Sequence, residues 1–174
     1  SPLQIGRMHR TLALYSARKY AWGYSATPYT VQADETWDFN IKFYQDIVVP
    51  TGVTLTVQCI VEMVPEAKVI VEAGGRLIID GGTFTAAQYS DSFWGGIEVW
   101  GNSNQHQYPA NHPDHQGIVV LKNGAVIEHA REAIRLWKPN DWESMGGVVQ
   151  VQGTNDPATW PKFINCRRSA EFMK

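Results

Sequence analysis

The chain of 174 residues is poor in charged side chains and has no strongly basic stretch. Charged residues make up 18% of it, the formal net charge is −2, and no run of five Lys or Arg occurs. Such a chain lacks the electrostatic footprint of a protein that binds nucleic acid or an anionic membrane. No apolar stretch approaches the roughly 18–20 residues of a membrane-spanning helix. We therefore expect no nucleic-acid partner and no membrane span.

Cysteine is also scarce, with only Cys59 and Cys166. In the repeat described below they lie three coils apart, or about 14 Å at ~4.8 Å per rung. A disulfide requires Cα atoms within about 7 Å of each other. We predict two free thiols, so cysteine usage does not indicate a cellular compartment.

Sequence motifs for catalysis are absent. The chain has no H-E-x-x-H zinc motif and no G-x-S-x-G nucleophile motif. Its Gly-Gly pairs are followed neither by a helical pattern nor by Lys-Ser/Thr, so they are not phosphate-binding loops. We predict no catalytic residue, no cofactor and no metal site in this chain.

A short repeat is the strongest positive signal. Residues Gly74–Thr85, GGRLIIDGGTFT, read as two β runs joined at a Gly-Gly corner, and variants begin at Gly52, Gly117 and Gly147. Each run has about 4–5 residues rich in Val, Ile, Leu and Thr, and Gly or Asn bounds it, which is typical of strands between turns. One coil cannot bury its own apolar face, so neighbouring coils must stack. The pattern predicts an all-β fold, a three-sided parallel β-helix of about four coils, right-handed by the crossover rule.

The predicted strands fall three to a coil. They are Val53–Val57, Ile60–Val64 and Lys68–Glu72; Arg76–Asp80, Thr83–Thr85 and Gly96–Trp100; Ile118–Lys122, Ala125–Glu128 and Ala133–Trp137; Val148–Gln152, Lys162–Asn165 and Ser169–Met173. Before them, alternating Trp37, Phe39, Ile41 and Phe43 predict one extended strand within residues 31–49. We expect this strand to cover the open end of the first coil.

An α-helix is predicted over residues 1–20. Ser1 suits the N-cap, Pro2 suits the first helical position and Gln4 completes a capping box. Apolar residues follow at helical spacing, and Gly23 and Pro28 mark a break. We divide the chain into a helix and linker at 1–30, expected to be the remnant of an upstream domain, and a β-helix at 31–174.

The stretch SPLQIGRMH resembles the last helix of pappalysin-like metzincin proteases, in which a Ser/Thr-Pro-x-Gln-x-x-Arg-Met stretch follows the Met-turn. The repeats after it resemble those of secreted Bacteroidota-type proteins. Some of those proteins carry such a protease domain upstream and a type IX sorting signal downstream. The resemblance implies a secreted or cell-surface bacterial protein. With no zinc motif here, it implies that the catalytic residues of any parent protease lie outside this chain.

The alternation of each strand predicts which side chains face the core. We expect inward, stacked positions at Leu55, Leu77, Ile79, Phe84, Ile97, Val99, Ile134 and Leu136, with Ala170 and Phe172 also facing in. Glu98, Arg135 and Glu171 recur at offsets of 37 and 36 and predict an exposed acid–base–acid column on adjacent rungs.

The candidate ligand-binding residues are Trp100 and Trp137, with Tyr108, His112, His115 and Trp142 from nearby insertions. The two tryptophans end equivalent strands and are predicted to point outward as a stacked pair, ~4.8 Å apart. The insertions Gly101–Gln116 and Lys138–Gly146 follow them and should leave the same corner, whereas Ala86–Gly95 leaves another. Two interpretations remain open. Either the loops bury the indoles, or the indoles form an aromatic platform for a sugar or a partner side chain.

Two other groups of side chains are candidates for chemistry. His106, His112 and His115 with Asp114 could bind zinc or copper, but their spacing matches no tight metal motif and suits an ordinary polar loop. Asp80, Asp91, Glu98 and Glu128 could supply acid–base pairs, but they form no local Asp-Asp pair and suit solvated corner charges.

We therefore expect a non-catalytic β-helix module that acts as a spacer or binds a glycan or another protein. The alternative is a carbohydrate-active β-helix enzyme of the polysaccharide lyase or glycoside hydrolase type.

Overall fold

The computed structural model describes Gln4 and residues 23–87 and 92–172. The helix predicted over residues 1–20 therefore lies, apart from Gln4, outside the described residues, as does Asp91. No helix of the described residues is long and apolar enough to cross a membrane.

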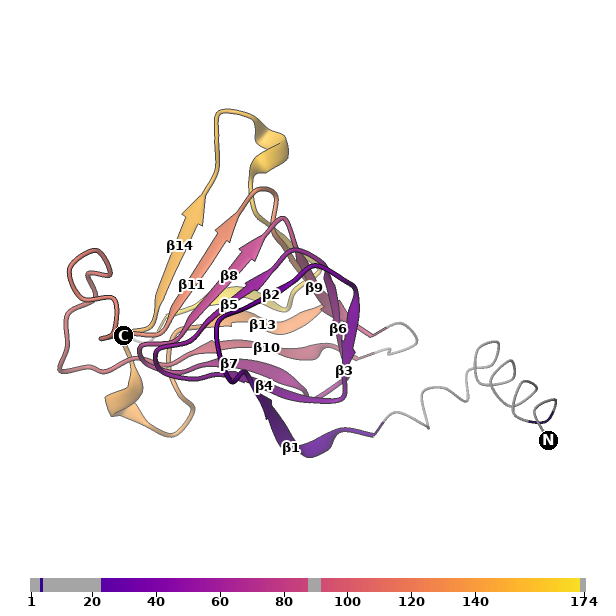
Figure 1. Cartoon of the computed structure of the whole chain (residues 1–174), viewed down its shortest axis with the longest axis horizontal. Coiled ribbons are helices and arrows are strands. Elements are labelled where there is room, and N and C mark those ends of the chain that lie inside the picture. Colours follow the sequence, from indigo (N-terminus) through magenta and orange to yellow (C-terminus); the bar gives the residue numbers. More distant parts are fainter. Residues whose placement is uncertain (1–3, 5–22, 88–91, 173–174) are drawn as a thin grey trace.

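The described strands form three parallel sheets that make the sides of a triangular solenoid (Figure 1). Sheet A contains β1 (Ser25–Thr30), β4 (Gln45–Val49), β7 (Lys68–Val71), β10 (Trp94–Val99), β13 (Ala130–Arg135) and β16 (Arg168–Glu171). Sheet B contains β2 (Glu35–Trp37), β5 (Thr54–Val57), β8 (Arg76–Asp80), β11 (Ile118–Lys122) and β14 (Val148–Gln152). Sheet C contains β3 (Ile41–Phe43), β6 (Ile60–Met63), β9 (Thr83–Ala86), β12 (Val126–Glu128) and β15 (Lys162–Ile164).

The predicted all-β parallel β-helix is confirmed, and every one of the twelve strands predicted for the four coils is present as β5 to β16. Each coil passes from sheet B to sheet C to sheet A. The right-handed sense stays a prediction. Two short 3-10 helices, η1 (Trp142–Ser144) and η2 (Pro157–Thr159), lie in corner insertions.

The prediction of one extended strand within residues 31–49 is wrong. This segment forms a complete coil of β2, β3 and β4, so the solenoid has five coils rather than four, and β1 adds a further strand to sheet A. The alternation is interrupted because Phe39 lies in the corner between β2 and β3 and is 66% exposed. Tyr29, Trp37 and Phe43 pack together at this end of the core, with ring centroids 5.1–6.2 Å apart.

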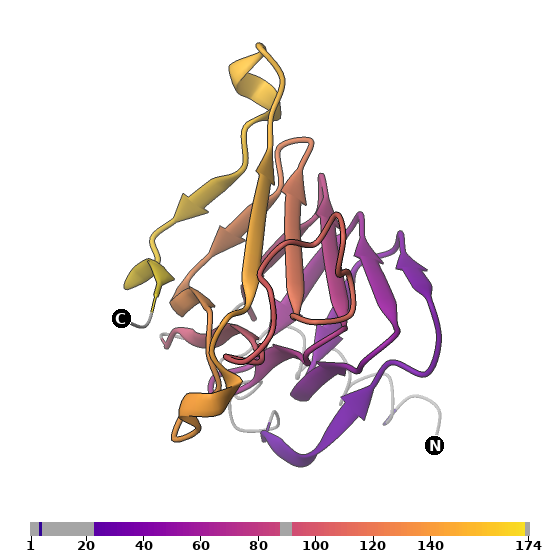
Figure 2. The ribbon, with the colours of Figure 1, turned by 90° about the vertical axis from the view of Figure 1, so that its left-hand side faces the viewer.

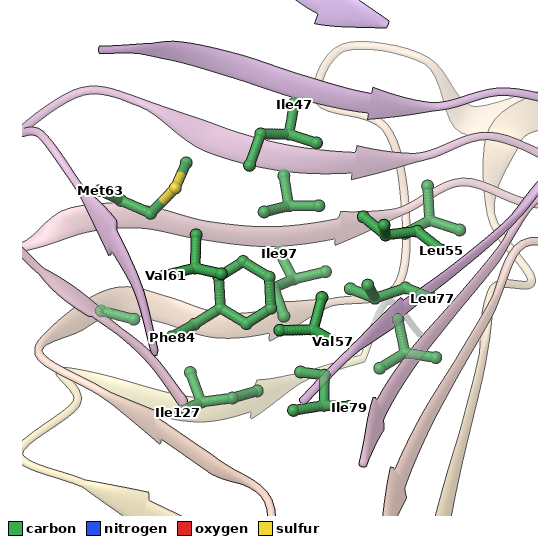
Figure 3. Packing of buried hydrophobic residues seen from close by; sticks show 14 of the residues in the cluster. Ile47, Leu55, Val57, Val61, Met63, Leu77, Ile79, Phe84, Ile97 and Ile127 are labelled. Atoms are coloured by element: carbon green, nitrogen blue, oxygen red, sulfur yellow. The ribbon is translucent and has the colours of Figure 1, made fainter. Parts of the chain in front are cut away.

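The core consists of columns of apolar side chains that run along the solenoid (Figure 3). All eight predicted core residues are buried, and the register pairs Leu55 with Leu77 and Leu77 with Val119. The predicted register is therefore correct. Ala170 and Phe172 in the last coil are exposed, because no described strand lies beyond β16 to cover them.

Sheet A contains one irregularity that matters for the site. Gly96 pairs with Glu132 but Ile97 pairs with Ile134, so Ala133 is an extra residue in β13. This β-bulge accounts for the offset of 37 between Glu98 and Arg135. Gly96 has φ +96°, and a Cβ there would overlap the carbonyl oxygen of Glu132. Glycine is therefore required for the close approach of β10 to β13.

The first two coils are joined by side-chain hydrogen bonds at their corners. A side-chain oxygen from the first coil accepts a backbone N–H of the second at 2.8–3.0 Å in three places: Asp34 from Thr54, Asn40 from Ile60, and Asp46 from Lys68. These bonds satisfy strand N–H groups at the corners, where a backbone partner is hardest to supply.

Candidate functional site

The outer face of sheet A carries a network of ion pairs across four rungs, β7, β10, β13 and β16. Its members, here called the ion network, are Lys68, Glu98, Glu132, Arg135, Arg168 and Glu171. Glu98 is 5% exposed, and its Oε1 lies 3.0 Å from Lys68 Nζ and 3.3 Å from Arg135. The ion network contains three acids and three bases, so its formal charges sum to zero.

The acid–base–acid column is confirmed in its order and register, since Glu98 pairs with Arg135 and Arg135 with Glu171. Its predicted exposure is wrong, because Glu98 is buried beneath its partners. Lys68 was missed. It pairs by register with Gly96 rather than Glu98, and its long side chain reaches the carboxylate diagonally.

Replacing Glu98 with glutamine is expected to lower the free energy of unfolding by about 1–3 kcal/mol, because Lys68 and Arg135 then lose a shared buried partner. Chemical denaturation of both proteins measures the difference. The matched control is Glu66→Gln, which removes an exposed ion pair with Arg131 and should cost about 0–1 kcal/mol. Equal losses in the two variants would contradict a stabilising role for the buried carboxylate.

The two tryptophans point from sheet A but do not stack on each other. Among the ring contacts of the described residues there is no pair between Trp100 and Trp137, and both side chains are half-buried. Instead Lys138 Nζ lies 4.6 Å from the ring centroid of Trp100, and the Arg135 guanidinium carbon lies 5.5 Å from that of Trp137. Cation–π attraction therefore takes the place of the expected stack.

A hydrogen bond from the indole N–H also restrains the orientation of the Trp100 ring. Its Nε1 donates a hydrogen bond to Glu98 Oε2 at 3.2 Å, which links the indole to the ion network. The sequence analysis did not identify Lys138 as part of this site. Its position directly after the outward Trp137 could have indicated that it lies near the indoles. The indoles are half-buried, neither covered completely by the loops nor fully open to solvent.

The two long insertions leave the same corner, as predicted, and they contact each other. Gly101 N–H donates to Ser144 O at 3.0 Å, and Ser103 N–H donates to Glu143 O at 2.9 Å. The buried Gln116 holds the first loop from within, accepting from the Asn102 N–H at 2.7 Å and donating to its carbonyl at 2.9 Å. Gln116 was also missed, because a glutamine before a strand glycine carries no distinctive signal.

The histidines of the first loop form a stack of three rings. His112 and His115 lie 4.3 Å apart at 5°, and His106 lies 5.3 Å from His112. Of the predicted ligand-binding residues, the structure therefore brings His112 and His115 together. Tyr108 and Trp142 are exposed and have no ring contact in the described part of the chain.

Stacked imidazoles are poorly arranged for a metal ion. Ring lone pairs lie in the ring planes, so near-parallel stacked rings do not direct them at one point. Within residues 23–87 and 92–172 no group of three His, Cys, Asp or Glu has metal-binding geometry. His115 Nδ1 is buried without a hydrogen-bond partner in the structure.

A hollow of about 650 Å³ lies between these loops and the last coil. Leu136, Met145, Val149 and Phe172 contribute apolar lining. Polar groups on its lining come from Asn102, Ser103, Gln105, His106 and Gln107. The sequence did not predict this hollow, because it is formed jointly by the two insertions and the last coil.

Of the four carboxylates considered for acid–base chemistry, Asp80 and Glu98 are held by structural partners. Asn123 donates a hydrogen bond to Asp80, and this bond is the main reason why the pKa of Asp80 is lowered. Asp141, which was not among the four, also has a lowered pKa, chiefly because the Ser144 hydroxyl donates to it at 2.8 Å. A general acid in a glycosidase requires the opposite, a raised pKa. Glu98 is engaged by two cations.

Both thiols are free, as predicted. Cys59 is buried and Cys166 is half-buried, and burial raises the pKa of each thiol. A raised pKa disfavours the reactive thiolate, so neither cysteine resembles an activated nucleophile.

Fold and surface together define a three-sided parallel β-helix protein with two long insertions in contact at one corner. A scan against protein-family models finds no matching family. Searches of curated proteins and of solved structures find no match either.

Proposed function

We propose that this chain is a non-catalytic β-helix module that binds an uncharged glycan on the outer face of sheet A. The observation that carries the proposal is the pair of half-buried indoles, Trp100 and Trp137, held beside the balanced ion network. Sugar rings present apolar C–H faces that pack on indoles, while their hydroxyl groups need nearby donors and acceptors. Beside the indoles, Lys138 and Arg135 supply donors and Glu98 supplies acceptors.

The charges around the indoles favour a neutral ligand. The six members of the ion network balance, and Lys138 has its own partner in Asp141 at 3.6 Å. The ion network and Lys138, as far as the structure describes them, therefore offer no unbalanced cation to a uronic acid. Because each indole already has a cation over one ring face, a ligand would use the remaining exposed part of the ring.

The wider setting is also part of the proposal. The resemblance of SPLQIGRMH to the last helix of a pappalysin-like metzincin domain supports a module that follows such a domain in a secreted or surface bacterial protein. Glycan binding by the module would then hold the protease near a carbohydrate-bearing substrate or surface.

The test is titration calorimetry of the whole chain with neutral oligosaccharides, using cellopentaose, chitopentaose and mannopentaose as probes. Trp100→Ala should weaken binding about fivefold, because the loss of one aromatic contact costs about 1 kcal/mol. The matched control is Trp160→Ala, which removes an exposed indole from the corner between sheets B and C and should leave the affinity unchanged.

Two outcomes would contradict the proposal. Absence of binding to every neutral probe by the folded chain would leave a spacer role. New reducing ends or unsaturated products from polyuronides or neutral glycans would support the enzyme alternative.

A further inference from the structure

The outer face of sheet B carries two apolar side chains that are buried outside the core. In β11, Val119 and Leu121 face inward and belong to the core cluster. Because side chains alternate along a strand, Ile118 and Val120 face outward. They are nevertheless only 0% and 4% exposed. A segment outside sheet B must therefore cover β11.

The covering segment is the first long insertion, Gly101–Gln116, here called the histidine loop. Figure 2 shows it crossing in front of β8 and β11, and Figure 1 places the same loop outside sheet B. A Cβ at Gly74, in the corner before β8, would lie 3.0 Å from the carbonyl oxygen of Asp114, so the loop contacts this part of the solenoid. The histidine loop therefore shields an apolar patch on the outside of sheet B.

Hydrogen bonds attach the histidine loop at its base. Gly101 and Ser103 donate to the second insertion, and Gly117 N–H donates to the Trp100 carbonyl at 2.8 Å. In the described part of the chain, every hydrogen bond of residues 104–115 stays within the loop. The middle of the loop is therefore held against sheet B by packing, and it can leave the sheet without disrupting a strand.

Three imidazoles lie in this middle part and are arranged as neutral rings would be. His112 and His115 stack at 4.3 Å and 5°, and His106 lies 6.4 Å from His115. Positive charges on two of these rings would repel each other at this spacing. His115 Nδ1 is buried and has no hydrogen-bond partner, so its protonation would bury a charged donor without an acceptor. The closed loop therefore disfavours protonation of the stack.

Charged groups near the loop do not offset an imidazolium ion. His129 is the one histidine of the described residues with an ion pair, and it lies outside the loop. In the second insertion Lys138 pairs with Asp141. At the far ends of β8 and β11, Lys122 pairs with Asp80. The remaining charged groups on the loop and beside it are Glu72, Arg76, Asp114 and Glu143.

We propose that the histidine loop is a pH-sensitive lid, which covers sheet B while its imidazoles are neutral and leaves the sheet when they are protonated. Opening moves the rings into water, where they accept protons without burial or stacking against opposing charges. Opening therefore takes up protons, and acid favours the open form. Each proton taken up raises the ratio of open to closed loop about tenfold per pH unit. An unperturbed histidine titrates at about pH 6.5, so the loop should stay closed above this value and open below it.

The test measures the accessibility of Ile118 by methyl NMR of the whole chain, with isoleucine labelling and a soluble gadolinium chelate. Relaxation enhancement at the Ile118 methyl groups should rise about fivefold or more between about pH 7.5 and about pH 5. Ile127, which is 1% exposed in the core, should stay protected at both values. Ile60, which is 42% exposed, gives the reference for an accessible methyl group.

Variants separate the loop histidines from other titrating groups. His112→Phe combined with His115→Phe keeps two flat rings that cannot be protonated, and should keep Ile118 protected at about pH 5. His115→Lys places a permanent positive charge at the buried position, and should expose Ile118 already at about pH 7.5. The control is His129→Asn, which removes a histidine outside the loop at a φ of +55° that asparagine tolerates. It should respond to pH as the unaltered chain does.

An Ile118 accessibility that does not change with pH would overturn the proposal. An equal rise in the double phenylalanine variant would do the same, since another group would then drive the change. A parallel rise at Ile127 would show unfolding of the solenoid in place of loop opening, and would also overturn it. Far-ultraviolet circular dichroism checks that each variant is folded, and none of these measurements requires a glycan.

Discussion

Replacing Gly96 with alanine is expected to lower the free energy of unfolding by about 2–6 kcal/mol, because the added Cβ meets a closer contact here than at any other glycine that the structure describes. Two costs combine. A non-glycine residue at a positive φ costs about 1–3 kcal/mol, and overpacking of a tight contact costs about as much again. At Gly96 the added carbon would overlap the Glu132 carbonyl, so β10 and β13 must separate at the bulge.

Gly52→Ala is a matched control for this effect. Gly52 has φ +79°, but a Cβ there meets nothing within 4 Å. It therefore carries the conformational cost alone, about 1–3 kcal/mol. Chemical denaturation of both variants should show Gly96→Ala to be the more destabilised. Equal losses would contradict a close approach of the two strands at the bulge.

Truncation of Leu77 to alanine should cost about 2–5 kcal/mol, from lost apolar burial and from the cavity left behind. Leu77 is fully buried in the column between Leu55 and Val119. Regular backbone pairing holds the neighbouring coils at a fixed spacing, so the column cannot collapse freely around the gap. Thermal or urea denaturation measures the loss.

The comparison for Leu77 is Ile60→Ala, also in a strand but 42% exposed. It should cost about 1 kcal/mol or less, because much of its side chain is in water in the folded state. If Leu77→Ala were as mild as Ile60→Ala, the column would not be the close-packed core inferred from the register.

The sequence predicted the coils well because each strand occupies the same environment as the strand it pairs with, so the same residue types recur at equivalent positions. Leu55 and Leu77 are apolar for the same reason, and both end in the same column. Prediction failed where local pattern and three-dimensional position disagree. Phe39 continues an apolar alternation but occupies a corner, and Phe172 continues an inward alternation but has no described strand above it.

The site was predicted less completely, because it depends on side-chain reach and on contacts between separate loops. Offsets placed Glu98, Arg135 and Glu171 on one line, since register fixes Cα positions. They could not show that Lys138 would lie over Trp100, which depends on the path of the chain after the strand. The three-histidine stack depends likewise on the folding of one loop.

The corner hydrogen bonds of the first two coils bear on how the molecule folds. Asp34, Asn40 and Asp46 each reach a residue only 20 or 22 positions ahead. Short loops close at small entropic cost, so a pair of adjacent coils can form before the rest of the chain is ordered. We expect each later coil then to add to an existing edge, so that assembly grows along one axis.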